Sequence, residues 1–149
     1  MSSFVVWKIA DKRLVACIQV VSGTAPTLEG ICNRKGLDPN DCAATTIDQH
    51  LTTRQFLQLN YIGDNGPEQR PNMPCSVDKT IVDADGFDFV TISGAPALAV
   101  IQTEYEGEKA VIGQSDGDDV ELVFNLPGDY QVTVSLYPYV DWTETINAT

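Results

Sequence analysis

Apolar and polar positions follow a regular pattern only in the second half of the chain. Short apolar or alternating runs recur near residues 80–82, 87–93, 97–104, 108–113, 119–126, 130–137 and 141–148. Turn-forming residues separate the runs, among them Asp85-Gly86, Asp116-Gly117 and Pro127-Gly128. Seven short strands at this spacing are typical of a sandwich of two β-sheets. We therefore predict such a sandwich over residues 70–149.

Two of these runs alternate, which identifies the face that each turns to the core. The apolar positions are Val120, Leu122, Phe124 and Leu126 in one run and Tyr130, Val132, Val134 and Leu136 in the next. The turn at 127–129 is expected to join the two runs as a hairpin. Tyr130 stands two residues before Val132, in the position of the tyrosine corner of immunoglobulin-like sandwiches, where the hydroxyl bonds to an upstream backbone group. Because Val132 replaces the cysteine of antibody domains, packing alone must hold this core.

The first 69 residues read as a small, strand-rich domain with a less regular pattern. Phe4–Ile9 and Arg13–Val21 are apolar and β-branched, and predict an N-terminal hairpin. Three prolines within residues 67–74 forbid a helix there and mark the connection to the sandwich. The predicted fold class is mainly all-β, with domains at 1–69 and 70–149. The other expected features are loops at Ser22–Pro26 and 33–41, a short helix opened by Asp41–Ala44, a strand over Phe56–Ile62 and a turn at Gly63–Gly66.

Charge changes at the same boundary. Residues 1–70 carry seven basic and seven acidic side chains, whereas residues 71–149 carry two basic and fourteen acidic ones, so 2 − 14 = −12 accounts for the whole net charge. An acidic half of this kind repels phosphate backbones, so a nucleic-acid partner is not expected.

Residues able to do chemistry are sparse. His50 is the single histidine, and in its polar stretch we expect it to be an exposed surface residue. No Ser/His/Asp pattern or phosphate-binding glycine loop accompanies it. Carboxylates gather at Asp83–Asp88 and Asp116–Asp119, where calcium is an alternative to simple solvated turns. We expect no enzyme, no metal and no cofactor.

The four cysteines are Cys17, Cys32, Cys42 and Cys75, with no C-x-x-C pair among them. Buried free thiols, disulfides formed after release into an oxidising medium, and a zinc site are the three alternatives. Four cysteines allow three pairings, within or between chains, and spacing does not select one.

Hydropathy and the first residues bear on location. No apolar run approaches the roughly 18 residues that a membrane-spanning helix needs, so no membrane partner is expected. The segment after Met1 lacks the basic and apolar regions of a secretory signal, so folding in a cytoplasm is expected.

Several segments together resemble a known class of protein. The run from Ala84 to Asp88, followed by an alternating strand, resembles the start of bacterial Ig-like domains of the invasin type. The order of motifs is similar to that of small virion proteins of tailed bacteriophages: Arg70-Pro-Asn-Met-Pro74, then Pro127–Val134, then Tyr137–Trp142, with Ile146-Asn-Ala148 at the close. The resemblance implies a tail-associated structural part of the virion, made in a host cytoplasm.

Three functions follow as hypotheses. The first is a phage tail protein (fibre, baseplate or adaptor) whose N-terminal half docks on other virion proteins, in several copies or as a homo-oligomer, while the sandwich projects. The second is a capsid decoration or cement protein. The third is a carbohydrate-binding module for a host surface glycan. Tyr137, Tyr139 and Trp142 are the candidate partner-contact residues, because grouped aromatics anchor partners.

Overall fold

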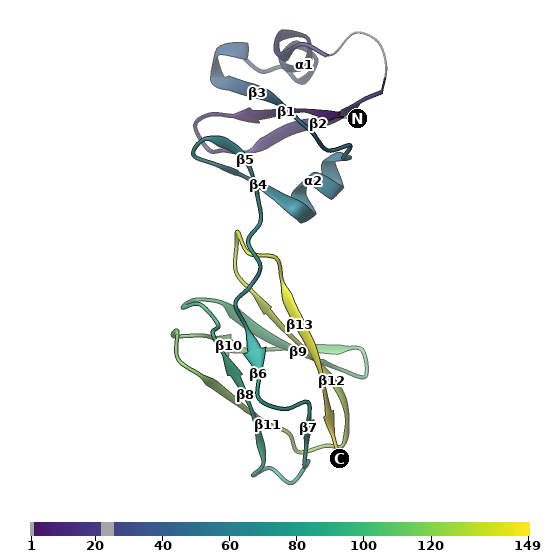
Figure 1. The fold of residues 1–149 in the computed structure, drawn as a ribbon, viewed down its shortest axis with the longest axis vertical. Coiled ribbons are helices and arrows are strands. Elements are labelled where there is room, and N and C mark those ends of the chain that lie inside the picture. Colours follow the sequence, from purple (N-terminus) through teal and green to yellow (C-terminus); the bar gives the residue numbers. More distant parts are fainter. Residues whose placement is uncertain (1, 22–25) are drawn as a thin grey trace. The chain divides into compact units, whose positions relative to one another are not determined.

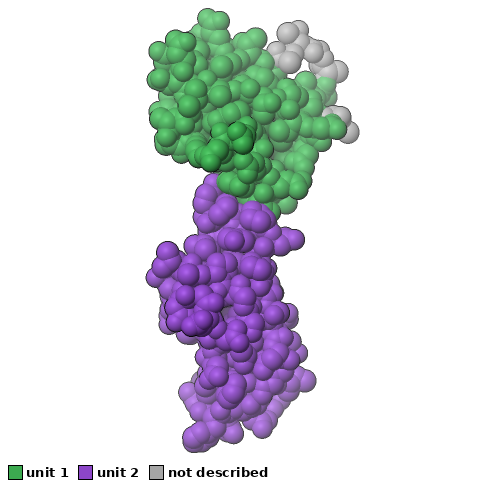
Figure 2. Space-filling view, turned by 60° about the vertical axis from the view of Figure 1, so that its left-hand side comes forward, with its two compact units in different colours: residues 1–70 green, residues 71–149 purple. Residues whose placement is uncertain are grey.

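A computed structural model describes residues 2–21 and 26–149. The chain divides into two units, Met1–Arg70 and Pro71–Thr149, one residue beyond the expected boundary (Figure 2). Strands predominate in both units, so the predicted mainly-β fold class is confirmed. Residues 22–25 of the expected loop at Ser22–Pro26 lie outside the described residues.

Unit 1 is built on a three-stranded antiparallel sheet with the order β2-β1-β3. Val5 and Val6 are consecutive in β1 and fully buried, because successive strand residues point to opposite faces and both faces are covered. Figure 1 shows α1 on one side of the sheet and α2 with β4 and β5 on the other. The elements of unit 1 are β1 (Ser2–Lys8), β2 (Leu14–Val20), α1 (Leu28–Lys35), a 3-10 helix (Pro39–Asp41), β3 (Cys42–Ile47), α2 (Thr53–Leu59), β4 (Asn60–Gly63) and β5 (Gly66–Gln69).

The predicted hairpin forms from β1 and β2, but the strand expected over Phe56–Ile62 was wrong for its first half. Residues up to Leu59 belong to α2, and only β4 is a strand. The helix forms there because Thr52 and Gln55 make a reciprocal capping box at its start. Fully buried Phe56 then anchors α2 to the core that contains Val5.

The expected loop over 33–41 and the helix at Asp41–Ala44 were also misplaced. The loop begins after α1, which Thr27 caps at its start and Gly36 ends in the left-handed conformation (φ 67°). The side chain of Asp38 caps the 3-10 helix by accepting a hydrogen bond from Asn40 N. The chain then turns extended at Cys42, because β3 pairs with β1.

Unit 2 contains two sheets. A five-stranded sheet has the order β10-β9-β12-β13-β7, and a three-stranded sheet has the order β11-β8-β6. Each of the seven predicted runs overlaps one strand, and β6 is an additional one. The strands are β6 (Ser76–Val77), β7 (Ile81–Val82), β8 (Phe89–Ser93), β9 (Val100–Tyr105), β10 (Glu108–Gln114), β11 (Val120–Val123), β12 (Gly128–Ser135) and β13 (Trp142–Ala148).

Both sheets contribute to one buried cluster in unit 2. Val90 and Ile92 come from the smaller sheet, and Val132, Val134 and Ile146 from the larger one, all with no exposed surface. The hydrophobic effect on these contacts is the main source of stability for the unit.

The hairpin predicted at 127–129 does not form. β11 pairs with β8 and β12 pairs with β9 and β13, so the turn carries the chain from one sheet to the other (Figure 1). Because the chain is crossing between sheets, Leu126 leaves the core pattern and is 57% exposed, whereas Leu122 and Phe124 remain buried.

The proline-rich segment after Arg70 belongs to unit 2. The carbonyl of Pro71 accepts a hydrogen bond from Val140 N at 2.8 Å, and Asn72 forms a parallel bridge with Val140. Met73 is buried in the core of the unit. These contacts hold the start of unit 2 against the turn that precedes β13.

Candidate functional site

A groove of about 360 Å³ in unit 2 lies along β11, the last strand of the smaller sheet. One wall is made by six consecutive residues, 121–126. Thr103 and Tyr130, from the inner face of the larger sheet, and Ile112, from β10, complete the lining. The groove therefore opens between the edges of the two sheets.

A β-bulge directs Ile112 into this groove. Val111 pairs with Gln102 while Gly113 pairs with Ile101, so Ile112 is an extra residue in β10. Its side chain is 52% exposed. Together with Leu126 and Val123, it makes the rim of the groove apolar.

Two stacked tyrosines hold the loop that forms the end of the groove. The rings of Tyr105 and Tyr130 lie 4.5 Å apart at 17°. The Tyr130 hydroxyl donates to the carbonyl of Leu126 at 3.0 Å, and the Tyr105 hydroxyl donates to the carbonyl of Pro127 at 3.1 Å. The hydrogen bond from Tyr130 to an upstream carbonyl is the one that the tyrosine-corner position predicts. Tyr105 adds a second hydrogen bond to the same loop. We call this pair the tyrosine clamp.

The surroundings of Tyr130 favour the neutral form of its side chain. Burial is the main cause that raises the pKa of Tyr130 above its ordinary value, and the neighbouring Tyr105 and Glu106 raise it further. The Tyr130 hydroxyl therefore remains a donor at neutral pH. Glu121 is the one charged residue in the lining of the groove.

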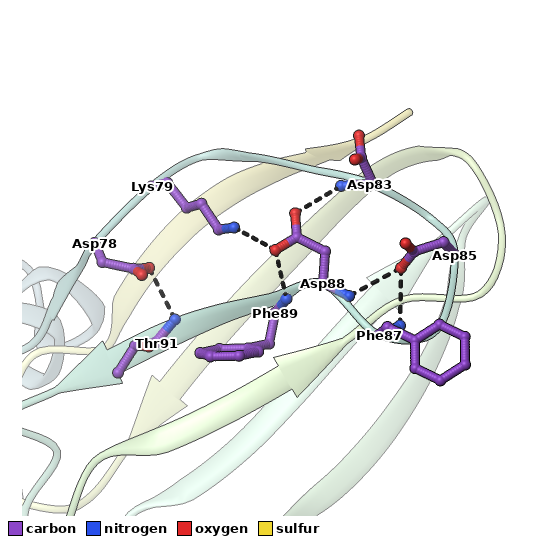
Figure 3. A network of polar contacts seen from close by, with 8 residues as sticks. All are labelled: Asp78, Lys79, Asp83, Asp85, Phe87, Asp88, Phe89 and Thr91. Carbon is purple, nitrogen blue, oxygen red and sulfur yellow. Dashed lines mark hydrogen bonds and ion pairs between the residues drawn. The ribbon is translucent and has the colours of Figure 1, made fainter.

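Two of the three carboxylates in Asp83–Asp88, those of Asp85 and Asp88, are engaged by hydrogen bonds in and beside this turn (Figure 3). Asp85 accepts from the backbone N–H groups of Phe87 and Asp88, both at 2.8 Å. Asp88 accepts from Lys79 Nζ at 2.5 Å and from the backbone N–H of Asp83 at 3.0 Å, while the carboxylate of Asp83 points away.

These bonds favour the ionised carboxylates. Backbone N–H donors hold the pKa of Asp85 below its usual range, and the Lys79 ammonium does the same for Asp88. Within residues 2–21 and 26–149, no three His, Cys, Asp or Glu side chains gather in a way that would hold a metal ion. The arrangement is that of a turn braced by its own side chains.

The three aromatic residues expected to contact a partner differ in their surroundings. Tyr139 and Trp142 are half-buried and pack against the core of unit 2. Tyr137 is 68% exposed. Two of the three residues therefore contribute to the core of unit 2, and the third is the most exposed.

The four cysteines are all free thiols, and they are distributed over separate cores. Cys17 lies on one face of the unit 1 sheet, Cys32 and Cys42 lie together on the other, and Cys75 belongs to unit 2. Burial raises the pKa of the Cys42 thiol, and its interaction with Cys32 raises it further. Burial likewise raises the pKa of Cys17 and of Cys75. The sequence selected no pairing; the structure places Cys32 and Cys42 in one cluster, with no disulfide between them.

The expectation that His50 is exposed was wrong. The residue is half-buried, and its Nδ1 has no hydrogen-bond partner among the described residues.

A separate hollow of about 540 Å³ in unit 1 lies beside β2, with Arg34 and Lys35 from α1 in its lining. No helix in the described ranges is both long and apolar enough to cross a membrane.

The groove was not predicted from the sequence. Gly113 inside an otherwise apolar strand was an available sign of the bulge, and the consecutive apolar pair Val111-Ile112 breaks the strict alternation of that strand. The second tyrosine of the clamp had no sequence signature.

No known protein-family model, curated protein or solved structure matches this chain.

Proposed function

We propose that the chain is a non-enzymatic structural component of a tailed phage particle, associated with the tail as a fibre, baseplate or adaptor protein. Unit 1 docks on other virion proteins, in several copies per particle, and unit 2 projects from the particle.

One observation carries the proposal: the separated motifs that resemble phage virion proteins belong to a single structural assembly. The nearest ends of the segments Arg70–Pro74 and Tyr137–Trp142 are 63 positions apart in the sequence (137 − 74 = 63). The two segments nevertheless meet, because Val140 N donates to the carbonyl of Pro71 and Asn72 forms a parallel bridge with Val140. Their joint occurrence therefore has a structural reason, since each segment fixes the other at one end of unit 2.

The strand arrangement supports an Ig-like sandwich for unit 2. The central strands β9, β12 and β13 with edge strand β10 correspond to the larger sheet of such domains, and β6, β8 and β11 correspond to the smaller one. The parallel pairing of β7 with β13 lets the first part of the domain contribute to both sheets.

The distribution of charge supports different roles for the two units. Unit 1 is formally neutral and offers the hollow beside β2, a strand at the edge of its sheet. Unit 2 carries the net charge of −12, which keeps copies of it apart in solution. A neutral docking unit and a mutually repelling projecting unit suit a multi-copy surface part.

Quantitative mass spectrometry of particles purified from a host that carries this gene tests the proposal. The expected result is the chain in a few to a few dozen copies per particle. Hundreds of copies on the head would favour the capsid decoration alternative over the tail. Absence from purified particles, with the chain present in the lysate, would overturn the proposal.

A further inference from the structure

We propose that the groove along β11 binds an extended segment of a partner protein, which pairs with the edge of β11 as an additional strand. The segment alternates apolar with polar residues and carries a Lys or Arg opposite Glu121. This inference concerns a partner of unit 2 and does not rest on the location of the chain in a particle.

The edge of the smaller sheet is open at β11. In the described part of the chain, β11 pairs with β8 on one side and with no strand on the other. Edge strands present unpaired N–H and C=O groups that accept a further strand. In Ig-like sandwiches of the constant type, a fourth strand occupies this position. Here the groove occupies it.

The walls of the groove supply apolar contact for such a strand. Ile112, Val123 and Leu126 are 52%, 47% and 57% exposed, although each is a large aliphatic side chain. The tyrosine clamp fixes the loop that bears Leu126, so the groove is formed before a ligand arrives. Preformed apolar surface of this kind lowers the entropic cost of binding.

The edge of the larger sheet at β10 is less suited to pairing. β10 carries the bulge at Ile112 and a lysine, Lys109, paired with Glu104 at 3.5 Å. Bulges and edge lysines are the devices by which proteins prevent strand addition. We therefore assign the new strand to β11 rather than to β10.

Charge selects the chemistry of the partner. Unit 2 has fourteen acidic and two basic side chains, and the groove itself contributes Glu121 as its one charge. A second copy of unit 2 would bring like charge to the groove and be repelled. A segment with Lys or Arg is attracted to the unit as a whole and pairs with Glu121 at the site.

The test uses the full chain and a displayed library of random decapeptides. Selected peptides are expected to alternate apolar and polar residues and to contain Lys or Arg. On addition of a selected peptide, hydrogen–deuterium exchange should slow at the backbone amides of β11. L126D and I112D, both at exposed positions, should each weaken binding at least about tenfold.

A charge reversal sharpens the test. E121K should weaken the binding of the basic peptides at least about tenfold. A new selection on this variant should favour peptides that contain Asp or Glu. D141K is the matched control, because this substitution makes the same change in net charge outside the groove. Asp141 is exposed and lies before β13. It should leave the selected sequences unchanged and lower affinity much less. Circular dichroism establishes that each variant is folded.

Three outcomes would overturn the proposal. The first is a selection whose peptides bind equally well to the wild type, L126D and I112D. The second is binding that leaves exchange at β11 unchanged, since strand addition must protect those amides. The third is self-association of the chain that L126D abolishes, which would make a second copy the occupant.

Discussion

We predict that the stability of unit 2 depends on the two hydroxyl groups of the tyrosine clamp. Tyr105→Phe and Tyr130→Phe each remove one hydroxyl and keep the stacked ring. Each lost hydroxyl had donated to a backbone carbonyl of the loop between β11 and β12, at 3.1 Å and 3.0 Å respectively. The perturbation therefore tests the two hydrogen bonds with little change in packing.

A hydrogen bond of this kind contributes about 0.5–1.5 kcal/mol net. Both bonds lie near the surface, where water can satisfy the released carbonyls, so we expect the lower part of that range, about 0.5–1 kcal/mol for each variant. In a domain of 60–100 residues this corresponds to a fall in Tm of about 2–8 °C. The double variant should depart from additivity, because the rings stack and the acceptors are adjacent.

Urea unfolding followed by amide NMR measures each unit separately. Tyr61→Phe is the matched control, because the Tyr61 hydroxyl donates to Glu68 within unit 1 at 2.6 Å. It should leave the stability of unit 2 unchanged. Unchanged stability of unit 2 in both Tyr105→Phe and Tyr130→Phe, or a loss of stability in unit 1 instead, would contradict this prediction.

The pH dependence gives a second readout for the clamp. Because the pKa of Tyr130 is raised in the folded state, the stability that its neutral form contributes is complete below about pH 10 and is lost as pH rises through the raised value. Tyr130→Phe should therefore reduce the loss of stability in alkali. An identical alkaline loss in the wild type and the variant would contradict this.

Four further predictions follow from single sites. Gly128→Ala should destabilise unit 2 by about 1–3 kcal/mol, because φ is +144° and the added Cβ would lie 2.7 Å from the Tyr105 ring; an unchanged urea midpoint would contradict this. Phe56→Ala should destabilise unit 1 by about 3–5 kcal/mol and leave the transition of unit 2 in place by calorimetry, since Phe56 is fully buried in a unit 1 core. Because the pKa of Asp88 is lowered in the folded state, its contribution is present above about pH 4 and is lost on further acidification, so Asp88→Asn should flatten the acid limb of the stability curve. Cys32 and Cys42 should alkylate slowly until the protein is denatured. Mild oxidation with a small disulfide should join the two thiols within one chain, as peptide mapping would show. Disulfide-linked dimers on a non-reducing gel would contradict this.

Sequence reasoning recovered unit 2 better than unit 1, for a physical reason. Alternation at Val132 and Val134 reports a strand with one buried face, and turn residues such as Gly128 mark the ends of such strands. In unit 1, β1 is covered on both faces, so its apolar run does not alternate. Helix α2 is short, and its capping box at Thr52 and Gln55 was the sign that was overlooked.

The groove lay beyond sequence reasoning because it depends on pairing between distant strands. The run 119–126 was correctly expected to contain a strand, but its partner was not predictable from its pattern. A local hairpin with β12 satisfies the same alternation as the observed pairing with β8. Only the second arrangement leaves Leu126 exposed and opens a groove between the sheets.

The location of unit 2 on an intact particle distinguishes a projecting tail protein from the alternatives. Gold-labelled antibodies against residues 71–149 should bind intact particles at the tail, because the proposed function places unit 1 on the particle and leaves unit 2 accessible. Labelling of the head alone, or of disrupted particles only, would contradict a projecting tail-associated protein.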